Sequence, residues 1–178
     1  MNQNHFDKEK NIEPGIKIME AQHKNYELLR EIFLTARQNT FSWLDPSIFL
    51  LEDFDKQTQG ELILIAFIED IPTGFISIWK PSNFIHHLYI DQKYQNKGIG
   101  TLLLNEALRH IKFPVTLKCL EDNTKAVDFY IRRGFLKQGK GQSENGNYIL
   151  FELSKEIRQT TNNNSKSKNH ESGSQSIQ

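Results

Sequence analysis

Cysteine, net charge and long apolar stretches are all scarce in this sequence of 178 residues. Its one cysteine, Cys119, excludes an intrachain disulfide. Lysine and arginine together number 22, as do aspartate and glutamate, so the chain lacks the basic excess with which proteins bind nucleic acid or anionic membranes. No stretch approaches the ~20 apolar residues of a membrane span, and residues 1–8 lack the apolar segment of a secretory signal. These absences predict a cytoplasmic protein without a nucleic-acid or membrane partner.

The chain does contain enough apolar residues for one domain. Hydrophobic residues make up 37% of the sequence, which includes 12 phenylalanines, and the length suits a single domain. Residues 1–15 are polar, and residues 154–178 are rich in Asn, Ser, Lys and Gln. A segment of that composition cannot bury enough apolar surface to offset the entropy of ordering it. We therefore expect a polar N-terminal segment over 1–15, a folded domain over 16–153 and a disordered polar tail over 154–178.

Strand and helix patterns alternate within the expected domain. Apolar residues at helical spacing predict a helix over residues 25–37. Asp45 before Pro46 is typical of a helix start, and that helix is expected to end within 57–60. Further helices are expected over 101–111 and 124–133. Strands are expected over residues 16–20, 61–69, 73–79, 84–90, 115–120, 136–141 and 147–153, with hairpin turns at 70–72 and 145–146.

Residues 95–100, which read Gln-Asn-Lys-Gly-Ile-Gly, carry the strongest functional signal. They lie between the apolar strand at 84–90 and the helix at 101–111. The first amides of a helix have no partner within it, and the helix dipole favours negative charge there. Gly98 and Gly100 let a phosphate approach the backbone without interference from a Cβ. The order strand, turn, helix predicts an anion site, although a purely structural turn could contain the same glycines.

A second motif follows the strand at 115–120. Residues 123–135 read N-x-x-A-x-x-F-Y-x-x-x-G-F. The two motifs, in this order and at this separation, resemble the GNAT superfamily of acetyl-CoA-dependent N-acetyltransferases, and the overall layout resembles its small bacterial-type members. The resemblance extends over residues 16–153. It implies an α/β fold, with a mixed, mostly antiparallel sheet of seven strands and helices on both faces.

The resemblance also implies how acetyl-CoA binds. Backbone amides of the glycine turn would hold the pyrophosphate, with side-chain help from Gln95, Lys97 and Thr101. The backbone at the end of the strand 84–90 would bind the pantetheine arm and polarise the thioester carbonyl. Asn123 would contact the cofactor, although its place as a helix cap explains it equally well. The implied cofactor-binding residues are Leu88, Tyr89, Ile90, Gln95, Asn96, Lys97, Gly98, Ile99, Gly100, Thr101, Asn123 and Tyr130.

Two residues are candidates for proton transfer. By the resemblance, Tyr130 protonates the departing thiolate, since a phenol can donate to a thiolate held close to it; the alternative is a core tyrosine beside Phe129. By the same resemblance, His86 is the candidate general base, since it lies two residues before the pantetheine-binding segment, and histidine is a residue type suited to removing a proton from an ammonium. The alternative is a hydrogen-bonded structural histidine. Strand alternation predicts that His86 and His87 face opposite sides, with a structural role for His87.

The acceptor pocket is implied on the loop 39–44, where Phe41 and Trp43 are candidate substrate-binding residues beside His86. Trp43 could instead be a hydrophobic staple before the helix start at Asp45. Cys119 alternates with Leu117 along a buried-looking strand, which favours a core position over a nucleophile. Three basic residues of the helix 124–133 could approach the ribose phosphate of the cofactor, although an exposed position on the helix is favoured for each: Lys125, Arg132 and Arg133.

These observations predict an N-acetyltransferase that moves acetyl from acetyl-CoA to a primary amine by direct attack in a ternary complex, without a metal. The sequence does not identify the acceptor, which is a small-molecule or peptide amine, and it leaves a homodimer possible. One alternative is a non-catalytic acyl-CoA-binding sensor module, which would keep the phosphate turn but be indifferent to Tyr130 and His86. The other is a toxin-like acetyltransferase acting on aminoacyl-tRNA, which the absence of net positive charge disfavours.

Overall fold

The computed structural model describes residues 15–155. The predicted polar N-terminal segment, apart from residue 15, and the predicted tail beyond residue 155 lie outside the described residues. The strands are β1 Ile16–Glu20, β2 Leu62–Ile68, β3 Ile71–Trp79, β4 Phe84–Ile90, β5 Val115–Leu120, β6 Leu136–Ser143 and β7 Gly146–Leu153. The α-helices are α1 Tyr26–Thr40, α2 Asp53–Gln57, α3 Ile99–Leu108 and α4 Thr124–Arg132, and the 3-10 turns are η1 His23–Asn25, η2 Pro46–Ile48, η3 Lys80–Ser82 and η4 Gln92–Tyr94.

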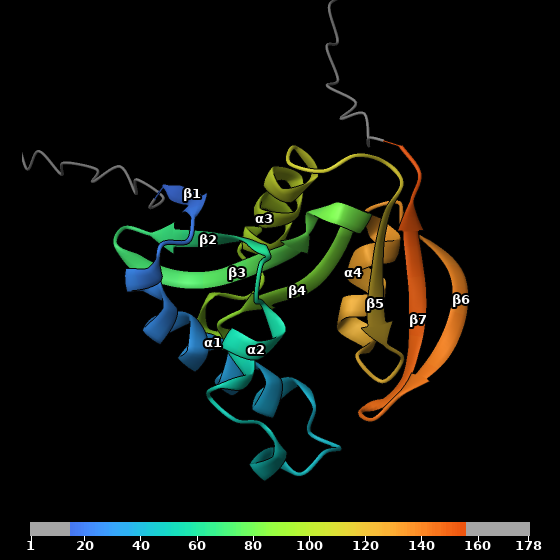
Figure 1. Ribbon diagram of the computed structural model, residues 1–178, viewed down its shortest axis with the longest axis horizontal. Helices are drawn as coiled ribbons and strands as arrows, with labels where there is room; N and C mark the ends of the chain where they lie inside the picture. The colour runs from blue at the N-terminus through green and yellow to red at the C-terminus, as the bar shows by residue number, and fades with distance from the viewer. Residues whose placement is uncertain (1–14, 156–178) are drawn as a thin grey trace, which may run out of the picture.

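One sheet contains all the strands, in the order β1-β2-β3-β4-β5-β7-β6. Every neighbouring pair is antiparallel except β4 with β5, which run parallel. Helices α1 and α2 lie on one face of the sheet, and α3 and α4 lie on the other (Figure 1). The prediction of a mixed, mostly antiparallel sheet with helices on both faces is confirmed.

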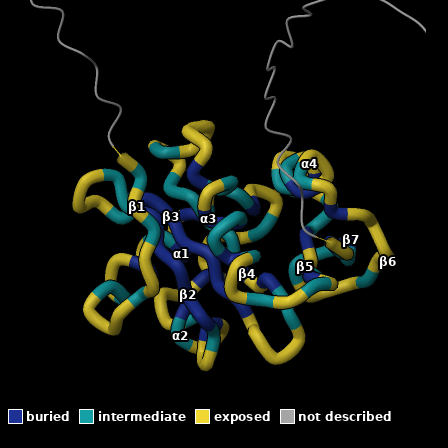
Figure 2. The backbone as a smooth tube through the Cα atoms, turned by 90° about the horizontal axis from the view of Figure 1, so that it is seen from above, coloured by how far each residue is buried: buried dark blue, intermediate teal, exposed yellow. Residues whose placement is uncertain are grey.

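Strands β2 and β3 are buried on both faces because helices cover each side of them. Their sequences are accordingly near-continuous apolar runs, as expected for strands without a solvent face. On the α1 side, Leu29 and Phe33 of α1 and Phe54 of α2 pack against Ile65 and Phe75. The buried backbone of β2 and β3 contrasts with the exposed β6 in Figure 2.

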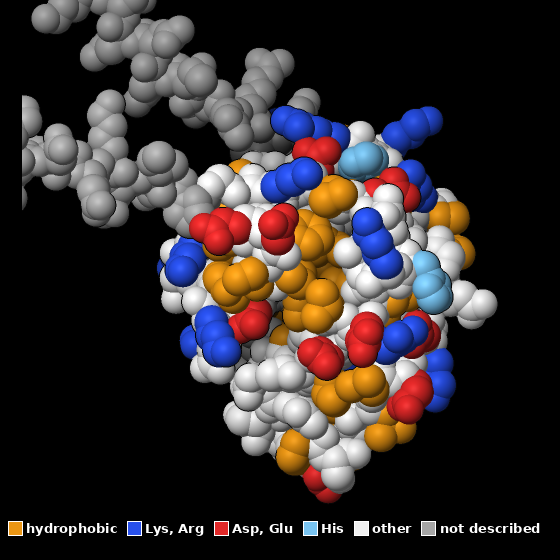
Figure 3. Space-filling view, turned by 90° about the vertical axis from the view of Figure 1, so that its left-hand side faces the viewer, with side chains coloured by type: hydrophobic (Ala, Val, Ile, Leu, Met, Phe, Trp, Pro, Cys, Tyr) orange, Lys and Arg blue, Asp and Glu red, His pale blue; other side chains and the backbone are white. Residues whose placement is uncertain are grey.

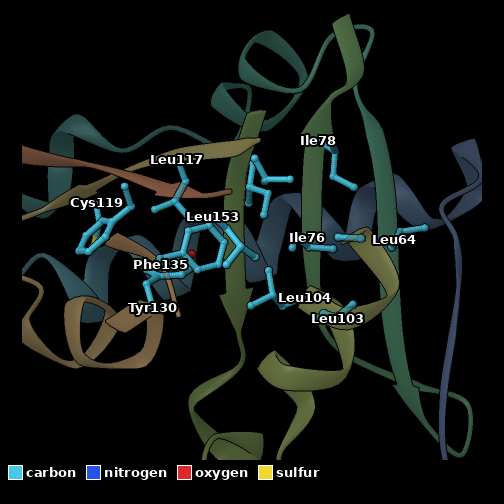
Figure 4. Close-up of a cluster of buried hydrophobic side chains, with 14 of the residues drawn as sticks. Leu64, Ile76, Ile78, Leu103, Leu104, Leu117, Cys119, Tyr130, Phe135 and Leu153 are labelled. Atoms are coloured by element: carbon cyan, nitrogen blue, oxygen red, sulfur yellow. The ribbon is translucent and has the colours of Figure 1, made fainter. Parts of the chain in front are cut away.

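The larger core cluster lies on the opposite face and joins the two halves of the sheet. Leu64 and Ile76 of β2 and β3 belong to the same cluster as Leu117 of β5 and Tyr130 of α4. Figure 4 shows these side chains on both sides of the β4 ribbon, with Leu104 of α3 among them. The cluster therefore fixes α4 against the sheet, which positions the residues of the second motif.

The predicted extent of the helix that begins at Asp45 is wrong. Asp45 does act as a cap, since its Oδ1 accepts a hydrogen bond from the Ser47 amide at 2.9 Å, but only the 3-10 turn η2 follows. Phe49 then adopts an extended conformation and packs its ring 5.9 Å from that of Phe41. Burial of this aromatic side chain and the hydrogen bonds around Asp53 interrupt the helix, which begins again as the short α2.

The surface shows no sign of a charged interface on the side drawn in Figure 3. There, Lys and Arg side chains alternate with Asp and Glu around hydrophobic side chains, so neither sign of charge dominates. Among the described residues, no helix has the length and apolar character needed to cross a membrane.

Candidate active site

A cleft opens where β4 and β5 separate. The two strands pair only at Phe84 with Thr116 and at Ile85 with Leu117, although β4 continues to Ile90. The resulting cleft has a volume of about 730 Å³. Its lining brings together most of the residues predicted to bind the cofactor: Leu88, Tyr89, Ile90, Gln95, Asn96, Gly98, Ile99, Gly100, Thr101, Asn123 and Tyr130.

The glycine turn forms one wall of the cleft and leads directly into α3. Gly98 is the N-cap of α3 and has φ +79°, a left-handed conformation that side chains rarely adopt. A Cβ at this position would meet no heavy atom within 4 Å. The helix starts at Ile99, two residues earlier than predicted, so Ile99 and Gly100 form its first turn. The backbone here is open to an anion from the cleft.

Two side chains of the turn have roles of their own. The amide group of Gln95 donates from Nε2 to the Ile90 carbonyl at 3.2 Å, which ties the turn back to the end of β4. Lys97 lies outside the cleft lining, with Nζ 5.2 Å from the centre of the Tyr94 ring. The structure thus separates these residues: Gln95 shapes the turn from within the cleft, whereas Lys97 is an exposed cation beside it.

Arg133 is a cleft residue that the sequence analysis assigned to an exposed helix face. Its Nη2 donates to Thr101 Oγ1, and its guanidinium carbon lies 4.7 Å from the centre of the Phe129 ring. Its Nε is buried and has no hydrogen-bond partner among the described residues. The spacing could have revealed it, because residues three apart on a helix share a face and Arg133 follows Tyr130 by three. Arg133 supplies the cleft with a positive charge beside the glycine turn.

Tyr130 reaches the cleft from α4 while most of its ring is buried. The ring packs against Phe135 and Phe151, with centroids 5.5 and 6.1 Å away. Burial raises the pKa of the Tyr130 hydroxyl well above its usual value, so the phenol keeps its proton at neutral pH and is available as a proton donor. Asn123, also in the cleft, accepts a hydrogen bond from the Ala126 amide at 3.2 Å and so caps α4.

The prediction that His86 and His87 face opposite sides is wrong. The pairing of β3 with β4 shifts register between Ser77 and Ile78, so that Ser77 lies opposite His87 while Ile78 lies opposite Ile85. His86 is the extra residue of this bulge, which breaks the alternation of side chains. The two imidazoles stack on the same side of the sheet, with centroids 3.9 Å apart.

The bulge gives the two histidines different environments on the α1 side. His87 is buried against Phe33, whose ring centroid is 4.9 Å away. Burial, and then the nearby charges of His86 and Arg37, hold the pKa of His87 well below its usual value, so this imidazole is neutral. His86 is more open, with 39% of its side chain exposed. The predicted structural role of His87 agrees with this burial.

Glu61, which precedes β2, is a site residue that the sequence analysis missed. Its Oε1 lies 2.7 Å from His86 Nδ1, although its side chain is only 4% exposed. An ionised Glu61 accepts a hydrogen bond from Nδ1–H, and this leaves the lone pair of His86 on Nε2. No local pattern reveals this contact, because the two residues are 25 positions apart and β3 separates their strands.

The end of α1 and the loop that follows it supply the remaining wall. Trp43 lines the cleft with 40% of its surface exposed, together with Asn39, Thr40 and Ser42. Phe41 is buried beneath it, with its ring centroid 5.5 Å from that of Trp43. Among the predicted site residues, Phe41, His86 and Lys97 are therefore the ones that lie outside the lining of the cleft.

The only cysteine is a core residue, as the sequence analysis favoured. Cys119 is buried in the larger core cluster. Burial raises the pKa of its thiol to about 12, so the thiolate needed for nucleophilic attack does not form near neutral pH. The cleft itself therefore offers Tyr130 and backbone amides, while the histidine pair lies outside its lining.

Comparison with known proteins agrees with this fold. The sequence matches the acetyltransferase (GNAT) family over residues 23–135, and the chain belongs to this family. It is similar to peptidyl-lysine N-acetyltransferase YjaB of Salmonella typhimurium, at 28% identity over 130 residues that span 71% of this chain and 88% of that protein. The chain is thus a GNAT-type acetyltransferase, an enzyme that transfers an acetyl group.

Solved structures share the architecture. The apo form of YjaB from Escherichia coli has a TM-score of 0.64 and 26% identity, over 79% of this chain and 97% of that one. The PaiA N-acetyltransferase of Thermoplasma acidophilum, solved in complex with coenzyme A, has a TM-score of 0.65 and 21% identity, over 79% of this chain and 99% of that one. The second likeness shows the shared fold.

Proposed function

We propose that this enzyme transfers acetyl from acetyl-CoA directly to a primary amine while both substrates are bound. The observation that carries the proposal is the cleft between β4 and β5, which has the Gly98 turn on one side and Tyr130 on the other. The cleft offers an anion site, free strand backbone and a proton donor. Direct transfer needs these features together with a base, and it needs no nucleophile such as Cys119.

The residues of the cleft fit the phosphates of acetyl-CoA. At Gly98 the backbone faces open space and adopts a conformation that favours glycine. Arg133 brings a guanidinium whose buried Nε has no partner within the described part of the chain, and this group can donate to a phosphate oxygen. The exposed Lys125 also lines the cleft. We assign the pyrophosphate to the turn, with Arg133 beside it.

The proposed reaction moves two protons. His86 Nε2 takes a proton from the ammonium, directly or through a water, while Glu61 holds the ring in the required tautomer. The neutral amine attacks the thioester carbonyl, whose oxygen is stabilised by backbone amides at the end of β4. The C–S bond then breaks, Tyr130 protonates the departing thiolate, and the second proton of the attacking nitrogen passes to Tyr130 and restores the phenol. The products are the acetylated amide and the free thiol of coenzyme A.

We propose a lysine side chain, presented by a peptide, as the first acceptor to test. The YjaB protein of Salmonella typhimurium is named a peptidyl-lysine N-acetyltransferase. The exposed indole of Trp43 at the mouth of the cleft suits the aliphatic part of a lysine side chain. The zero net charge favours such a partner over nucleic acid or a membrane surface. We expect the reaction to take place in the cytoplasm.

The proposal is tested by the release of free thiol from acetyl-CoA in the presence of lysine peptides, polyamines and amino acids. We expect turnover with at least one primary amine. Tyr130→Phe removes one hydroxyl and almost no volume, so turnover should fall ~10²-fold while affinity for acetyl-CoA is kept. Tyr148→Phe, on β7 outside the cleft, is the matched control and should keep wild-type turnover. Tight binding of acetyl-CoA without turnover of any amine would favour the sensor module instead.

A further inference from the structure

Three buried polar atoms without hydrogen-bond partners belong to one region on the α1 side of the sheet. Only four such side-chain atoms occur among residues 15–155, and Glu61 Oε2, Ser77 Oγ and His87 Nε2 are three of them. Ser77 lies directly opposite His87 in the ladder between β3 and β4. Buried polar groups normally have partners, so a local group of unpartnered ones points to a ligand that satisfies them.

The charge of this region is also unbalanced. The carboxylate of Glu61 is almost fully buried, and its one ion-pair partner among the described residues is His86. Arg37, a buried cation on the same side, directs its guanidinium to Asp53 and to the Leu50 and Phe33 carbonyls. A buried carboxylate is costly unless a positive charge compensates it. The missing partner should therefore be a cation.

We propose that Glu61, His86 and His87 bind one divalent transition-metal ion of the zinc class. One potential ligand atom from each residue lies within 4.8 Å of the other two. Two imidazoles and one carboxylate form a ligand set that zinc and its neighbours prefer, whereas magnesium and calcium prefer oxygen ligands. Binding requires the side chains to rotate toward the ion, because the two imidazole rings are stacked with 23° between their planes. The Ser77 hydroxyl can then form a hydrogen bond with one of the three metal-binding side chains.

The bulge in β4 creates this site. Without the extra residue, His86 and His87 would face opposite sides of the strand and could not share an ion. Glu61 reaches the pair from the start of β2, across β3. Because His86 is more exposed than the other two ligands, the ion can enter from solvent and keep a water in its remaining position.

A bound ion should also change the activity of the enzyme, an effect that rests on the proposed function. An ion bound to Glu61 and His86 takes the place of the proton that these two groups share, and it holds the imidazole that serves as the base. The amine would then lose its general base. Zinc should therefore lower turnover, and a chelator should restore it.

Metal binding is measured by titrating the chelator-treated full-length protein with zinc chloride, in the absence of acetyl-CoA and amine. We expect one tight equivalent per chain. Affinity should fall ~100-fold or more in His86→Ala and in Glu61→Gln, because each variant removes one of three ligands. His86→Ala changes a partly exposed side chain and should not affect folding, which an unchanged unfolding midpoint verifies. His110→Ala is the matched control, since its side chain is similarly exposed and pairs with Glu106 outside the cluster.

Cobalt provides a second readout that does not depend on activity. Co²⁺ should bind with the visible absorption of a low-coordinate site with nitrogen and oxygen ligands, and this absorption should be absent in His86→Ala. The proposal is overturned if zinc does not bind tightly, or if His86→Ala and Glu61→Gln bind it as the wild type does. Zinc binding by a protein that acetylates no amine would contradict the proposed base and leave the metal site intact. An active protein that does not bind zinc would overturn the metal site and leave the proposed base intact.

Discussion

The two halves of the sheet differ in how many of their faces are covered. In the first half, β2 and β3 have α1 and α2 on one face and α3 on the other, whereas in the second half α4 covers β5 and β7 on one face only and the edge strand β6 is exposed (Figure 1). The sequences reflect this difference. Five consecutive residues of β2 are buried, whereas buried residues alternate along β5. A strand covered twice needs an apolar residue at each position, and a strand covered once needs one at every second position.

The difference shows how stability and chemistry are distributed. The first half contributes strand β4 and the glycine turn to the cleft and carries the histidine pair outside its lining, and the second contributes Tyr130 of α4 together with Asn123 and Arg133 at the two ends of that helix. The cleft exists because the halves separate beyond the short β4–β5 ladder. The site therefore depends on both halves, while most of the burial that opposes unfolding should lie in the first.

The largest effect should come from a cavity in the doubly covered half. Phe75 is fully buried among Phe54, Tyr89 and Phe33, so Phe75→Ala should lower the free energy of unfolding by ~3–5 kcal/mol. Leu150→Ala, on the uncovered face of β7, should lower it by less than ~1 kcal/mol. Chemical denaturation measures both. Similar losses at the two positions would show that the halves contribute equally.

The next effect concerns the junction between the halves. Gly98→Trp places a large side chain in the open space at the glycine turn, so affinity for acetyl-CoA should fall ~10³-fold or more while the fold remains. Gly98→Ala is the control, because it carries the same backbone strain with a side chain too short to fill the site. Calorimetry on the two variants separates strain from obstruction. Equal affinities in Gly98→Trp and the wild type would place the cofactor elsewhere.

A smaller effect is expected at the bulge of β4. If His86 is the base, His86→Ala should lower turnover ~10²-fold at neutral pH. Raising the pH should restore part of the rate, because more of the amine is then already neutral. A pH–rate profile of His86→Ala beside His110→Ala measures this, and His110→Ala should match the wild type. A uniform loss at every pH would instead indicate a structural role for His86.

The smallest effect is the loss of stability at alkaline pH, which comes from the buried thiol and phenol of the second half. Burial raises the pKa of the Cys119 thiol to about 12 and also raises that of the Tyr130 hydroxyl. Unfolded chains lose these protons from pH ~8.5 for a thiol and ~10 for a phenol. The unfolded state then binds fewer protons than the folded state, so stability is full below those values and falls as pH rises through them.

Denaturation at a series of pH values should therefore show a decline above pH ~9 that is shallower in Cys119→Ala. At pH ~8, where an exposed thiol reacts readily, iodoacetamide should modify native Cys119 slowly and denatured Cys119 quickly. Rapid alkylation of the native protein would mean that the second half opens often enough to expose β5. Such opening would sharpen the contrast between the two halves.

Local patterns in the sequence were sufficient for the order of strands and helices, and the resemblance to the GNAT superfamily indicated the main residues of the cleft. The apolar runs of β2 and β3, the glycine turn at Gly98 and the helix that carries Tyr130 depend on side-chain period and on backbone preferences, which neighbouring residues determine. The same information placed Cys119 in the core. It also placed the N-cap at Asp45, although not the break in the helix that follows.

Only the tertiary structure decided which distant groups meet. The contact of Glu61 with His86 spans 25 positions and that of Thr101 with Arg133 spans 32. Both depend on strand register and helix packing, which involve the whole chain. The bulge at His86 arises in the same way, since one extra residue in β4 against β3 reverses the direction of a side chain without any local sequence signal. Pattern therefore determined the elements and the glycine turn, whereas register determined the histidine pair and its carboxylate partner.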